Sequence, residues 1–294
     1  MNAVDLSSET DKNLRLVSFI IIGAVYLSAG IVGFFLFQFL IQFIPEIPAL
    51  LAADCAATLV VWGFGLKWRN VSVYDPYWSV APPVILTAWA FYKHCFTVPA
   101  ILLLVAVWYW GTRLTLNWAY TFKGIDHEDW RYTRYRESLS PFRFHIVNFF
   151  GLNYFPTLIV FAAMLPGLLV FDSTAPAGAG IWAGFAMCLA APTIQLIADS
   201  QIHRFRVSNP GRYCDIGLWK HGRHPNYFGE ILMWWGVWVM YVSLEGLSTR
   251  PWLVLGALAM TAMFLFISIP MMERRQLQNK PGYAEYRSRT RILI

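Results

Sequence analysis

The stretch Leu16–Phe43, LVSFIIIGAVYLSAGIVGFFLFQFLIQF, contains no charged residue and decides the class of this protein. A helix needs about 20 consecutive apolar residues to cross a hydrocarbon core about 30 Å thick, because each residue adds about 1.5 Å. This stretch is long enough to cross. It therefore predicts a membrane-spanning helix rather than a helix buried in a soluble core.

The chain as a whole is strongly apolar. Of its 294 residues, 57% are hydrophobic and 14% are charged, whereas about 25% are charged in an ordinary soluble domain. With a mean hydropathy of +0.47, the chain has too few polar side chains to cover a water-exposed surface. It predicts an all-α, polytopic transmembrane helical bundle of seven or eight spans. The apolar stretches are residues 16–43, 48–66, 79–95, 98–120, 146–171, 178–200, 227–247 and 251–272.

Whether the third stretch, residues 79–95, crosses the membrane decides between seven and eight spans. It is short and contains Pro82 and Pro83, so a re-entrant segment would reduce eight spans to seven. Along the sequence, residues 1–71 form an N-terminal transmembrane hairpin and residues 72–294 a second domain, in which polar motifs concentrate.

The positive charges lie almost entirely on one side of this layout. Lys93 and Arg250 lie at short links on one side and Arg113 lies within a span, whereas the other Lys and Arg residues fall in loops on the opposite side. An excess of Lys and Arg in short loops marks the cytoplasmic face, so we expect both termini to be cytoplasmic. The basic loops are residues 67–78, 121–145, 201–226 and 273–294.

The net charge of +6 follows from this topology and from attraction to anionic lipid, so the expected partner is the bilayer and not a nucleic acid. No cleavable signal peptide is recognised in the polar first residues, and a bacterial inner membrane is the expected location. The four cysteines have no paired spacing and predict neither a disulfide framework nor a metal site; they are Cys55, Cys95, Cys188 and Cys214.

Two predicted spans carry polar stripes at membrane depth. Such residues are costly in lipid and usually face a cavity or a partner. Tyr109, Arg113, Asn117 and Tyr120 recur every three or four residues and share one helix face; an arginine extending to the interface is the structural alternative. A second stripe on residues 178–206 suggests a lined cavity, or else a structural ion pair; it consists of Gln195, Asp199, His203 and Arg206.

The segment Gly222–Glu230, GRHPNYFGE, opens the seventh stretch and is the most informative motif. Pro225 suits the first helical turn, where its missing N–H costs nothing. Arg223 and His224 precede a helix N-terminus, whose free N–H groups favour anions. These residues predict an anionic, phosphate-bearing cofactor at a membrane surface.

From about Ser72 to the end, the chain resembles the C-terminal domain of steroid 5-alpha-reductases, especially their bacterial relatives. The resemblance rests on the motif above, preceded by Gly217-Leu218-Trp219, and on four further segments: Val73–Ser79, Asp126–Tyr132, Ala198-Asp199 with Arg206, and Pro281–Arg287. It implies a seven-helix membrane bundle, to which the first span is an addition. It also implies NADPH-dependent reduction of a carbon–carbon double bond conjugated to a ketone.

The resemblance implies functional residues by position. Arg113 matches an arginine near the nicotinamide of NADPH, and the C-terminal positions match a segment that closes over the cofactor. Adding the polar stripes and the motif, the expected cofactor-binding set is Arg113, Asn117, Gln195, Asp199, His203, Arg206, Tyr213, Arg223, His224, Asn226, Tyr227, Glu230, Arg274, Arg275, Tyr283 and Tyr286.

The substrate side departs from the family. Animal steroid reductases carry a Gln-Glu pair on one helix and a catalytic Tyr on the next, which hold the substrate carbonyl, and no Gln-Glu pair is found here. Enone reduction needs charge stabilised on the carbonyl oxygen, which a Tyr or a protonated acid can provide. The expected catalytic residues are Asp75, Tyr77 and Tyr109.

Two other classes stay open. Membrane methyltransferases of the isoprenylcysteine or phospholipid type share an Arg-His-Pro-x-Tyr-x-Gly segment and bind S-adenosylmethionine. Glu273-Arg274-Arg275 stands where they usually carry paired glutamates, and the extra Arg suits the 2′-phosphate of NADPH. A non-enzymatic protein that kept only the fold is the third class.

Overall fold

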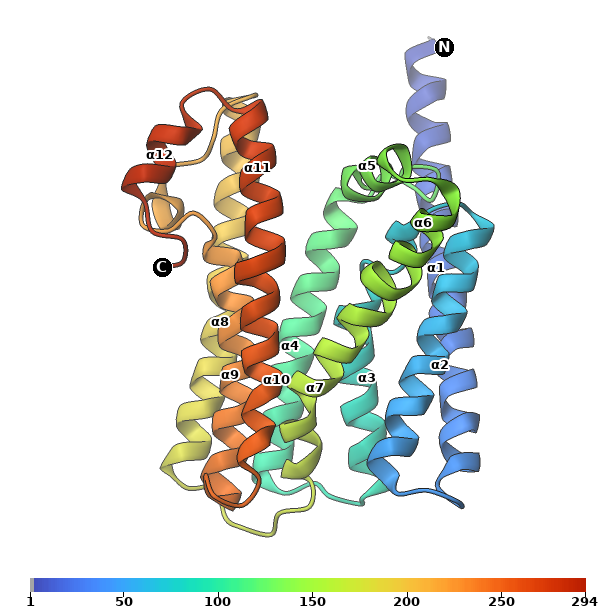
Figure 1. The fold of residues 1–294 in the computed structure, drawn as a ribbon, viewed down its shortest axis with the longest axis vertical. Helices are drawn as coiled ribbons and strands as arrows, with labels where there is room; N and C mark the ends of the chain where they lie inside the picture. Colours follow the sequence, from blue (N-terminus) through green and yellow to red (C-terminus); the bar gives the residue numbers. More distant parts are fainter. Residues whose placement is uncertain (1–2) are drawn as a thin grey trace. The chain divides into compact units, whose positions relative to one another are not determined.

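The computed structural model describes the backbone of residues 3–294 and the side chains from Lys12 onward. Its secondary structure is helical (Figure 1), and the one β feature in the described residues is an isolated bridge between Gly222 and Arg291. The helices are α1 (Ala3–Leu40), α2 (Glu46–Lys67), α3 (Tyr77–Tyr92), α4 (Val98–Thr121), α5 (Trp130–Ser138), α6 (Pro141–Ile146), α7 (Phe155–Val170), α8 (Ala179–Ser208), α9 (Pro225–Glu245), α10 (Val254–Met263), α11 (Ile269–Asn279) and α12 (Tyr283–Arg289).

Five short segments complete the chain. Two are π-helical and join neighbouring α-helices into long rods: η2 (Val147–Tyr154) and η5 (Phe264–Ser268). The others are 3-10 turns: η1 (Val71–Val73), η3 (Gly217–Lys220) and η4 (Pro251–Leu253).

Six described helical rods are long and apolar enough to cross a membrane. The expectation of an all-α polytopic membrane protein is therefore confirmed, whereas seven or eight spans stay a prediction. Two of the predicted spans, α3 and α9, are not among the six. α3 has only 16 residues, and α9 contains tryptophans and glutamates that lower its mean hydropathy. The six are residues 12–40, 46–67, 98–121, 141–170, 179–208 and 251–279.

The sixth apolar stretch, predicted to end at residue 200, continues as helix to Ser208. The last turns of this helix are polar, so they are not part of the apolar stretch. The three- and four-residue spacing of the polar stripe continues through them.

The chain forms two compact units, each built from separated segments. The first unit contains residues up to Ala81 together with Trp118–Leu158, and the second contains Pro82–Asn117 together with Ile159–Ile294.

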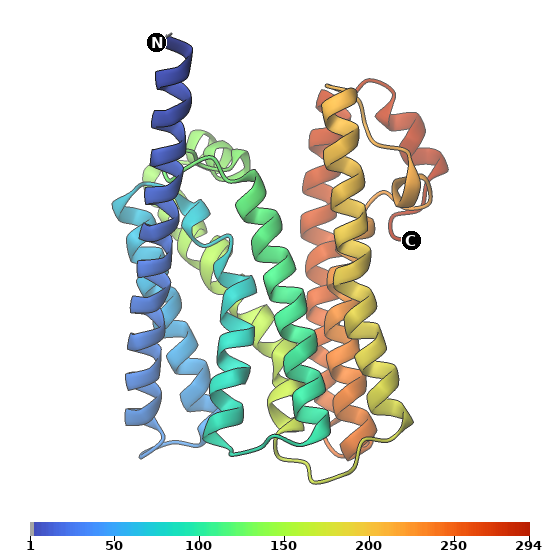
Figure 2. The same cartoon turned by 180° about the vertical axis from the view of Figure 1, so that it is seen from behind.

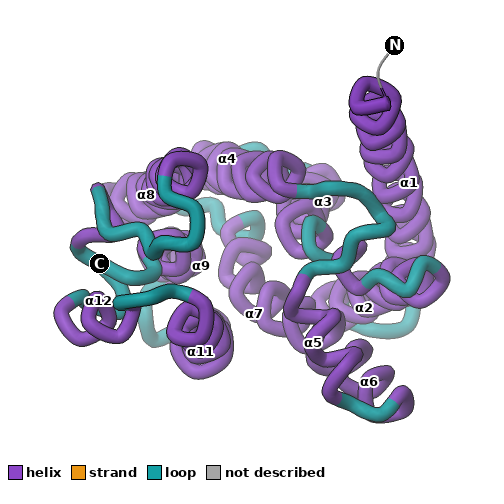
Figure 3. Tube along the Cα trace, turned by 90° about the horizontal axis from the view of Figure 1, so that it is seen from above, coloured by secondary structure: helices purple, strands orange, loops and turns teal. Residues whose placement is uncertain are grey.

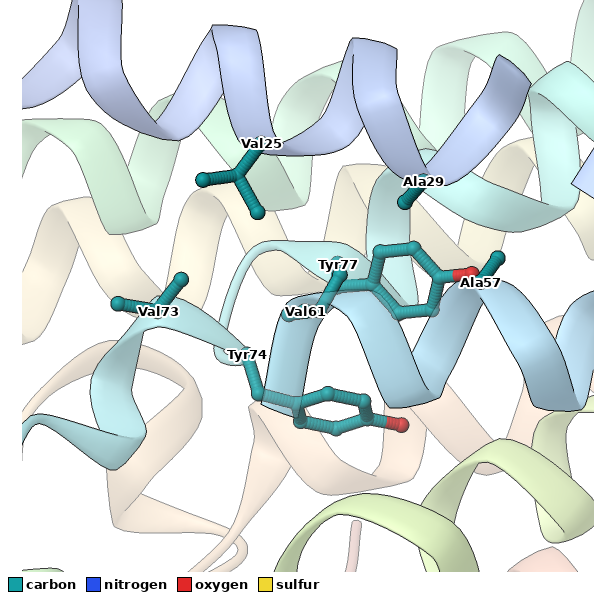
Figure 4. Close-up of a cluster of buried hydrophobic side chains, with 7 residues drawn as sticks. All are labelled: Val25, Ala29, Ala57, Val61, Val73, Tyr74 and Tyr77. Atoms are coloured by element: carbon teal, nitrogen blue, oxygen red, sulfur yellow. The ribbon is translucent and has the colours of Figure 1, made fainter. Parts of the chain in front are cut away.

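In the first unit, α1 packs along α2, and a methyl group added to Gly33 would lie 3.3 Å from the carbonyl oxygen of Ala53. A buried apolar cluster joins these helices to η1 and the start of α3 (Figure 4); it consists of Val25, Ala29, Ala57, Val61, Val73, Tyr74 and Tyr77.

The two basic loops of the first unit are bound to each other. The Asn70 side chain donates to the carbonyl of Ile125 at 2.6 Å, and the N–H of Val71 donates to Glu128 at 2.9 Å. The predicted cytoplasmic loops 67–78 and 121–145 therefore lie together.

In the second unit, α8 and α9 lie side by side next to the α10–α11 rod (Figure 2, Figure 3). α8 and α9 approach closely because glycines face the contact. A Cβ on Gly184 would lie 2.8 Å from the backbone N of Met240, and one on Gly236 would lie 2.5 Å from the sulfur of Cys188. Small residues of this kind commonly bring membrane helices together.

Candidate functional site

A buried ion pair joins α4 to α8 in the second unit. Arg113 of α4 contacts the Asp199 carboxylate of α8 through a guanidinium N–H, and both residues are buried. The other Asp199 oxygen accepts a hydrogen bond from the Asn226 side chain of α9 at 3.3 Å. The structure thus joins residues from both predicted stripes and the motif in one site.

The carboxylate of Glu230 is the most enclosed acid of this site, 2% exposed. It accepts hydrogen bonds from the indole N–H of Trp110 at 2.9 Å, the indole N–H of Trp234 at 3.0 Å and the amide of Gln195 at 2.8 Å. Three N–H donors offset the loss of water that burial imposes on a charged oxygen pair.

Gly229 explains how Gln195 reaches that carboxylate. A Cβ at residue 229 would lie 2.5 Å from Cγ of Gln195 and 2.7 Å from the carbonyl oxygen of Ala191. Any larger residue would separate α8 from α9 here, so the glycine of the GRHPNYFGE motif serves close helix packing.

Two buried polar atoms of this site have no hydrogen-bond partner among residues 12–294. They are Nε of Arg113, a donor, and Oε1 of Gln195, an acceptor. Buried polar atoms are nearly always paired, so such atoms point to a ligand or water. A primary amide offers both an acceptor and a donor, and the nicotinamide of NADPH carries such a group.

The stripe continues toward the end of α8. Nε2 of His203 lies 3.0 Å from Oδ1 of Asn117 on α4. One turn further, Arg206 is exposed and makes no salt bridge within the described part of the chain. Burial, together with the charges of Arg206 and Arg275, lowers the pKa of the Lys280 ammonium. Arg206 and Arg275 are thus each close enough to Lys280 to repel its charge, an arrangement that suits a phosphate.

A second charged cluster encloses the start of α9. Oε1 of Glu273 accepts a hydrogen bond from Nε of Arg223 at 2.6 Å and lies 3.4 Å from the His224 ring, while Oε2 pairs with Arg287 at 2.9 Å. Arg223 also donates to the carbonyls of Arg287 and Thr290. Burial lowers the pKa of His224, against the opposing effect of Glu273.

The backbone reinforces this second cluster. The N–H groups of Arg223 and His224 donate to the carbonyls of Arg291 at 2.9 Å and Ile292 at 3.1 Å. The C-terminal segment 283–294 therefore closes over residues 217–224, and we call this arrangement the C-terminal clasp. It commits the side chains of Arg223 and His224 to Glu273, so their contact with a phosphate stays a prediction.

The aromatic residues expected near the cofactor lie around this clasp. The rings of Tyr213 and Tyr286 stack with centroids 4.9 Å apart, and the Tyr286 hydroxyl donates to the carbonyl of Trp219 at 2.5 Å. The Tyr227 ring stacks on His224 at 5.3 Å. Tyr283 is buried beside Tyr213, and Arg274 is exposed.

Of the three expected catalytic residues, Asp75 and Tyr77 belong to the first unit and Tyr109 to the second. Tyr109 belongs to the second unit, where its hydroxyl lies 3.1 Å from that of Thr193. In the first unit, Asp75 accepts a hydrogen bond from the Tyr132 hydroxyl and lies 3.6 Å from the Arg131 guanidinium. Burial raises the pKa of Asp75 to about 6 despite the opposing charge of Arg131.

Tyr77 of the first unit lies elsewhere, with its hydroxyl 3.1 Å from Oδ1 of Asp54 on α2. Asp54 is not among the residues predicted from the sequence, although an acid within the apolar stretch 48–66 is a signal for function. A carboxyl on one helix and a tyrosine on the next is the kind of arrangement that the resemblance implies for the substrate carbonyl.

Other site residues were also missed. Trp110 and Trp234 gave no signal, because tryptophan is common in membrane helices. Within the described residues, no His, Cys, Asp and Glu cluster could hold a metal ion, and the cysteines are unpaired.

A family model described as "Protein of unknown function (DUF1295)" matches residues 61–290, and the chain belongs to this family, which is part of the steroid 5-alpha-reductase-like superfamily. The chain is also 21% identical over 257 residues to "Uncharacterized protein C594.04c" of Schizosaccharomyces pombe, covering 78% of this chain and 74% of the relative. No solved structure matches significantly.

Proposed function

We propose that this protein is a membrane-embedded NADPH-dependent reductase of a conjugated carbon–carbon double bond in a hydrophobic enone, such as a steroid or another lipid-like ketone. The observation that carries this proposal is the pair of unpartnered buried atoms, Nε of Arg113 and Oε1 of Gln195, in a site built from α4, α8 and α9.

The residues of the second unit fit the cofactor in two ways. Arg113 and Gln195 offer a donor and an acceptor to a carboxamide. Arg206, Arg275 and Lys280 supply positive charge for phosphate, with the charge-assisted hydrogen bonds that favour a 2′-phosphate. Bound NADPH supplies the hydride.

Of the expected catalytic residues in the first unit, Tyr77 is the better candidate for a proton donor. As negative charge develops on a carbonyl oxygen, a phenol O–H beside it stabilises that charge. Tyr77 is buried and has an O–H, which donates to Asp54, whereas the Asp75 carboxyl accepts a hydrogen bond from Tyr132 and lies 3.6 Å from the Arg131 guanidinium. We therefore assign the proton-donor role to Tyr77. Asp75 has a structural role, in which it joins the two basic loops of the first unit.

Ligand-dependent stability of the purified protein tests the cofactor. Thermal unfolding in detergent micelles would be followed by tryptophan fluorescence with NADPH, NADH or S-adenosylmethionine present. A ligand at 100 times its Kd stabilises the native state by about 2.7 kcal/mol. We expect the largest effect from NADPH, and stabilisation by S-adenosylmethionine alone would replace this proposal with the methyltransferase.

The variant Arg113→Lys sharpens the test. It keeps a cation beside Asp199 but removes the Nε donor, so NADPH affinity should fall roughly tenfold, the equivalent of one hydrogen bond of about 1.4 kcal/mol. The matched control is Lys93→Met, which removes a half-exposed ion pair to Asp172 in the same unit and should leave NADPH affinity unchanged. Equal affinities for the parent and Arg113→Lys would remove Arg113 from the site.

A further inference from the structure

The site built from α4, α8 and α9 holds two buried acids, and only one of them has a cation. Arg113 forms an ion pair with Asp199, whereas no Lys or Arg among residues 12–294 forms an ion pair with Glu230. Asp199 is 8% exposed and Glu230 is 2% exposed. With both acids ionised, two carboxylates and one guanidinium leave the site with one uncompensated negative charge.

The hydrogen bonds at Glu230 favour its ionised form. It accepts from Trp110 and Gln195 at Oε2 and from Trp234 at Oε1, so both of its oxygens face N–H donors. An indole N–H is only a donor, so neither tryptophan can accept a proton from the acid. Hydrogen bonds of this kind favour the carboxylate, although burial alone opposes the charge.

The same acid fixes the orientation of the Gln195 amide. Its NH2 group donates to Glu230 at 2.8 Å and to the backbone carbonyl of Asn226 at 3.2 Å. A carboxylate and a carbonyl can only accept, so the amide cannot be turned around. Oε1 of Gln195 is therefore the end of the amide that remains unpartnered among residues 12–294.

The two unpartnered atoms of the site lie beside its two acids. Oε1 of Gln195 belongs to the amide that contacts Glu230. Nε of Arg113 belongs to the guanidinium that contacts Asp199. Asn226 joins the two sides, because its side chain donates to Asp199 and its carbonyl accepts from Gln195. A ligand group that hydrogen-bonds to both unpartnered atoms would therefore lie near both carboxylates.

We infer that this site favours a ligand group with a positive charge, and that Glu230 supplies the negative charge that favours it. A buried carboxylate without a cation is costly, and a cationic ligand group beside it relieves that cost.

The identity of the charged group rests on the proposed function. The nicotinamide ring is neutral in NADPH and positively charged in NADP+, because the hydride leaves with two electrons for the β-carbon of the substrate. The substrate carbonyl oxygen takes its proton from Tyr77. Glu230 is thus placed to stabilise the positive charge that hydride transfer leaves behind.

Binding equilibria of ligands that differ in charge test this inference without turnover. Dissociation constants would be measured by calorimetry in detergent micelles at about pH 8, where an ordinary histidine with a pKa of about 6.5 is neutral. The parent should bind NADP+ at least tenfold more tightly than NADPH. In Glu230→Gln, which keeps the side-chain size and removes the charge, that ratio should fall at least tenfold. A purely structural loss would weaken both ligands equally and leave the ratio unchanged.

The matched control is Asp172→Asn, which removes an exposed carboxylate that pairs with Lys93 in the same unit. It should keep the NADP+ to NADPH ratio of the parent. An unchanged ratio in Glu230→Gln, or a parent that binds NADPH more tightly than NADP+, would overturn the inference. The parent ratio decides alone if Glu230→Gln does not fold.

A second pair of ligands separates this inference from the proposed function. S-adenosylmethionine carries a sulfonium cation, and S-adenosylhomocysteine lacks it. If neither nucleotide binds and S-adenosylmethionine binds at least tenfold more tightly than S-adenosylhomocysteine in a manner that depends on Glu230, the proposed function fails and the charge preference holds. Equal affinities within whichever pair binds would overturn the charge preference, and failure of both pairs to bind would overturn both proposals.

Discussion

Replacing Glu230 tests the buried polar network of the second unit. Glu230→Ala would leave three buried N–H donors without an acceptor, those of Trp110, Trp234 and Gln195. An unpaired buried donor costs about 1–3 kcal/mol, so the variant should lose roughly 3–9 kcal/mol of unfolding free energy. In Glu230→Gln, one amide oxygen can still accept from two donors while the NH2 group faces the third, which predicts a loss of about 1–3 kcal/mol.

The assay is equilibrium unfolding in mixed micelles, followed by tryptophan fluorescence. Met233→Ala is the comparison variant. It truncates a buried apolar side chain on the same helix and leaves the three N–H donors paired with Glu230. The reasoning is refuted if Glu230→Ala lies within 1 kcal/mol of the parent, or if the Ala and Gln variants lose equal stability. The first result would mean that water, and not Glu230, satisfies the three donors.

Three further predictions test other parts of the account. Arg223→Met should lower the free energy of unfolding by about 3–5 kcal/mol, because it breaks a buried ion pair with Glu273, and it should speed proteolysis of residues 283–294. The control Arg289→Met removes an exposed ion pair and should change the free energy of unfolding by less than about 1 kcal/mol. Because the pKa of Asp75 is raised, the native state binds more protons than the unfolded chain, and the free energy of unfolding should fall by roughly 3 kcal/mol as pH rises from about 4 to about 6. Asp75→Asn should remove that slope, and an unchanged slope in the variant would contradict the assignment. Cysteines introduced at Lys123, Lys220 and Lys280 should react only with a reagent on the cytoplasmic side, and reaction of any one from outside would overturn the topology.

Much of the second-unit site was predictable, because it follows helical periodicity. Arg113 and Asn117 on one helix, and Gln195, Asp199 and His203 on another, recur every three or four residues, so a contact between the two stripes brings several groups together at once. Asn226 and Glu230 follow the same rule on α9, and their contacts with Asp199 and Gln195 extend this expectation across a third helix.

The clasp was not predictable from such local patterns. Arg223 precedes a helix N-terminus, and this context indicates a phosphate ligand. In the structure Arg223 pairs with Glu273, 50 residues further along the chain, which α11 brings to the start of α9. Partner choice among charges depends on such long-range folding, which periodicity does not encode.

The pairing of Asp54 with Tyr77 was missed for a related reason. Tyr77 was selected together with Asp75, two residues before it, yet their side chains bond to different elements of the first unit, Tyr77 to α2 and Asp75 to α5. Neighbours in sequence at a loop-to-helix junction point in different directions, so adjacency did not predict a shared function.

A double-label experiment tests the central claim most directly. Membranes containing the protein would be incubated with NADPH deuterated at the transferred position and with S-adenosylmethionine carrying a labelled methyl group, and their lipids would be analysed by mass spectrometry. The account predicts a saturated ketone lipid with one deuterium on the carbon β to the carbonyl, formed at least tenfold more slowly by Tyr77→Phe. Methyl label in a lipid without deuterium, or neither label in membranes where NADPH is bound, would contradict it.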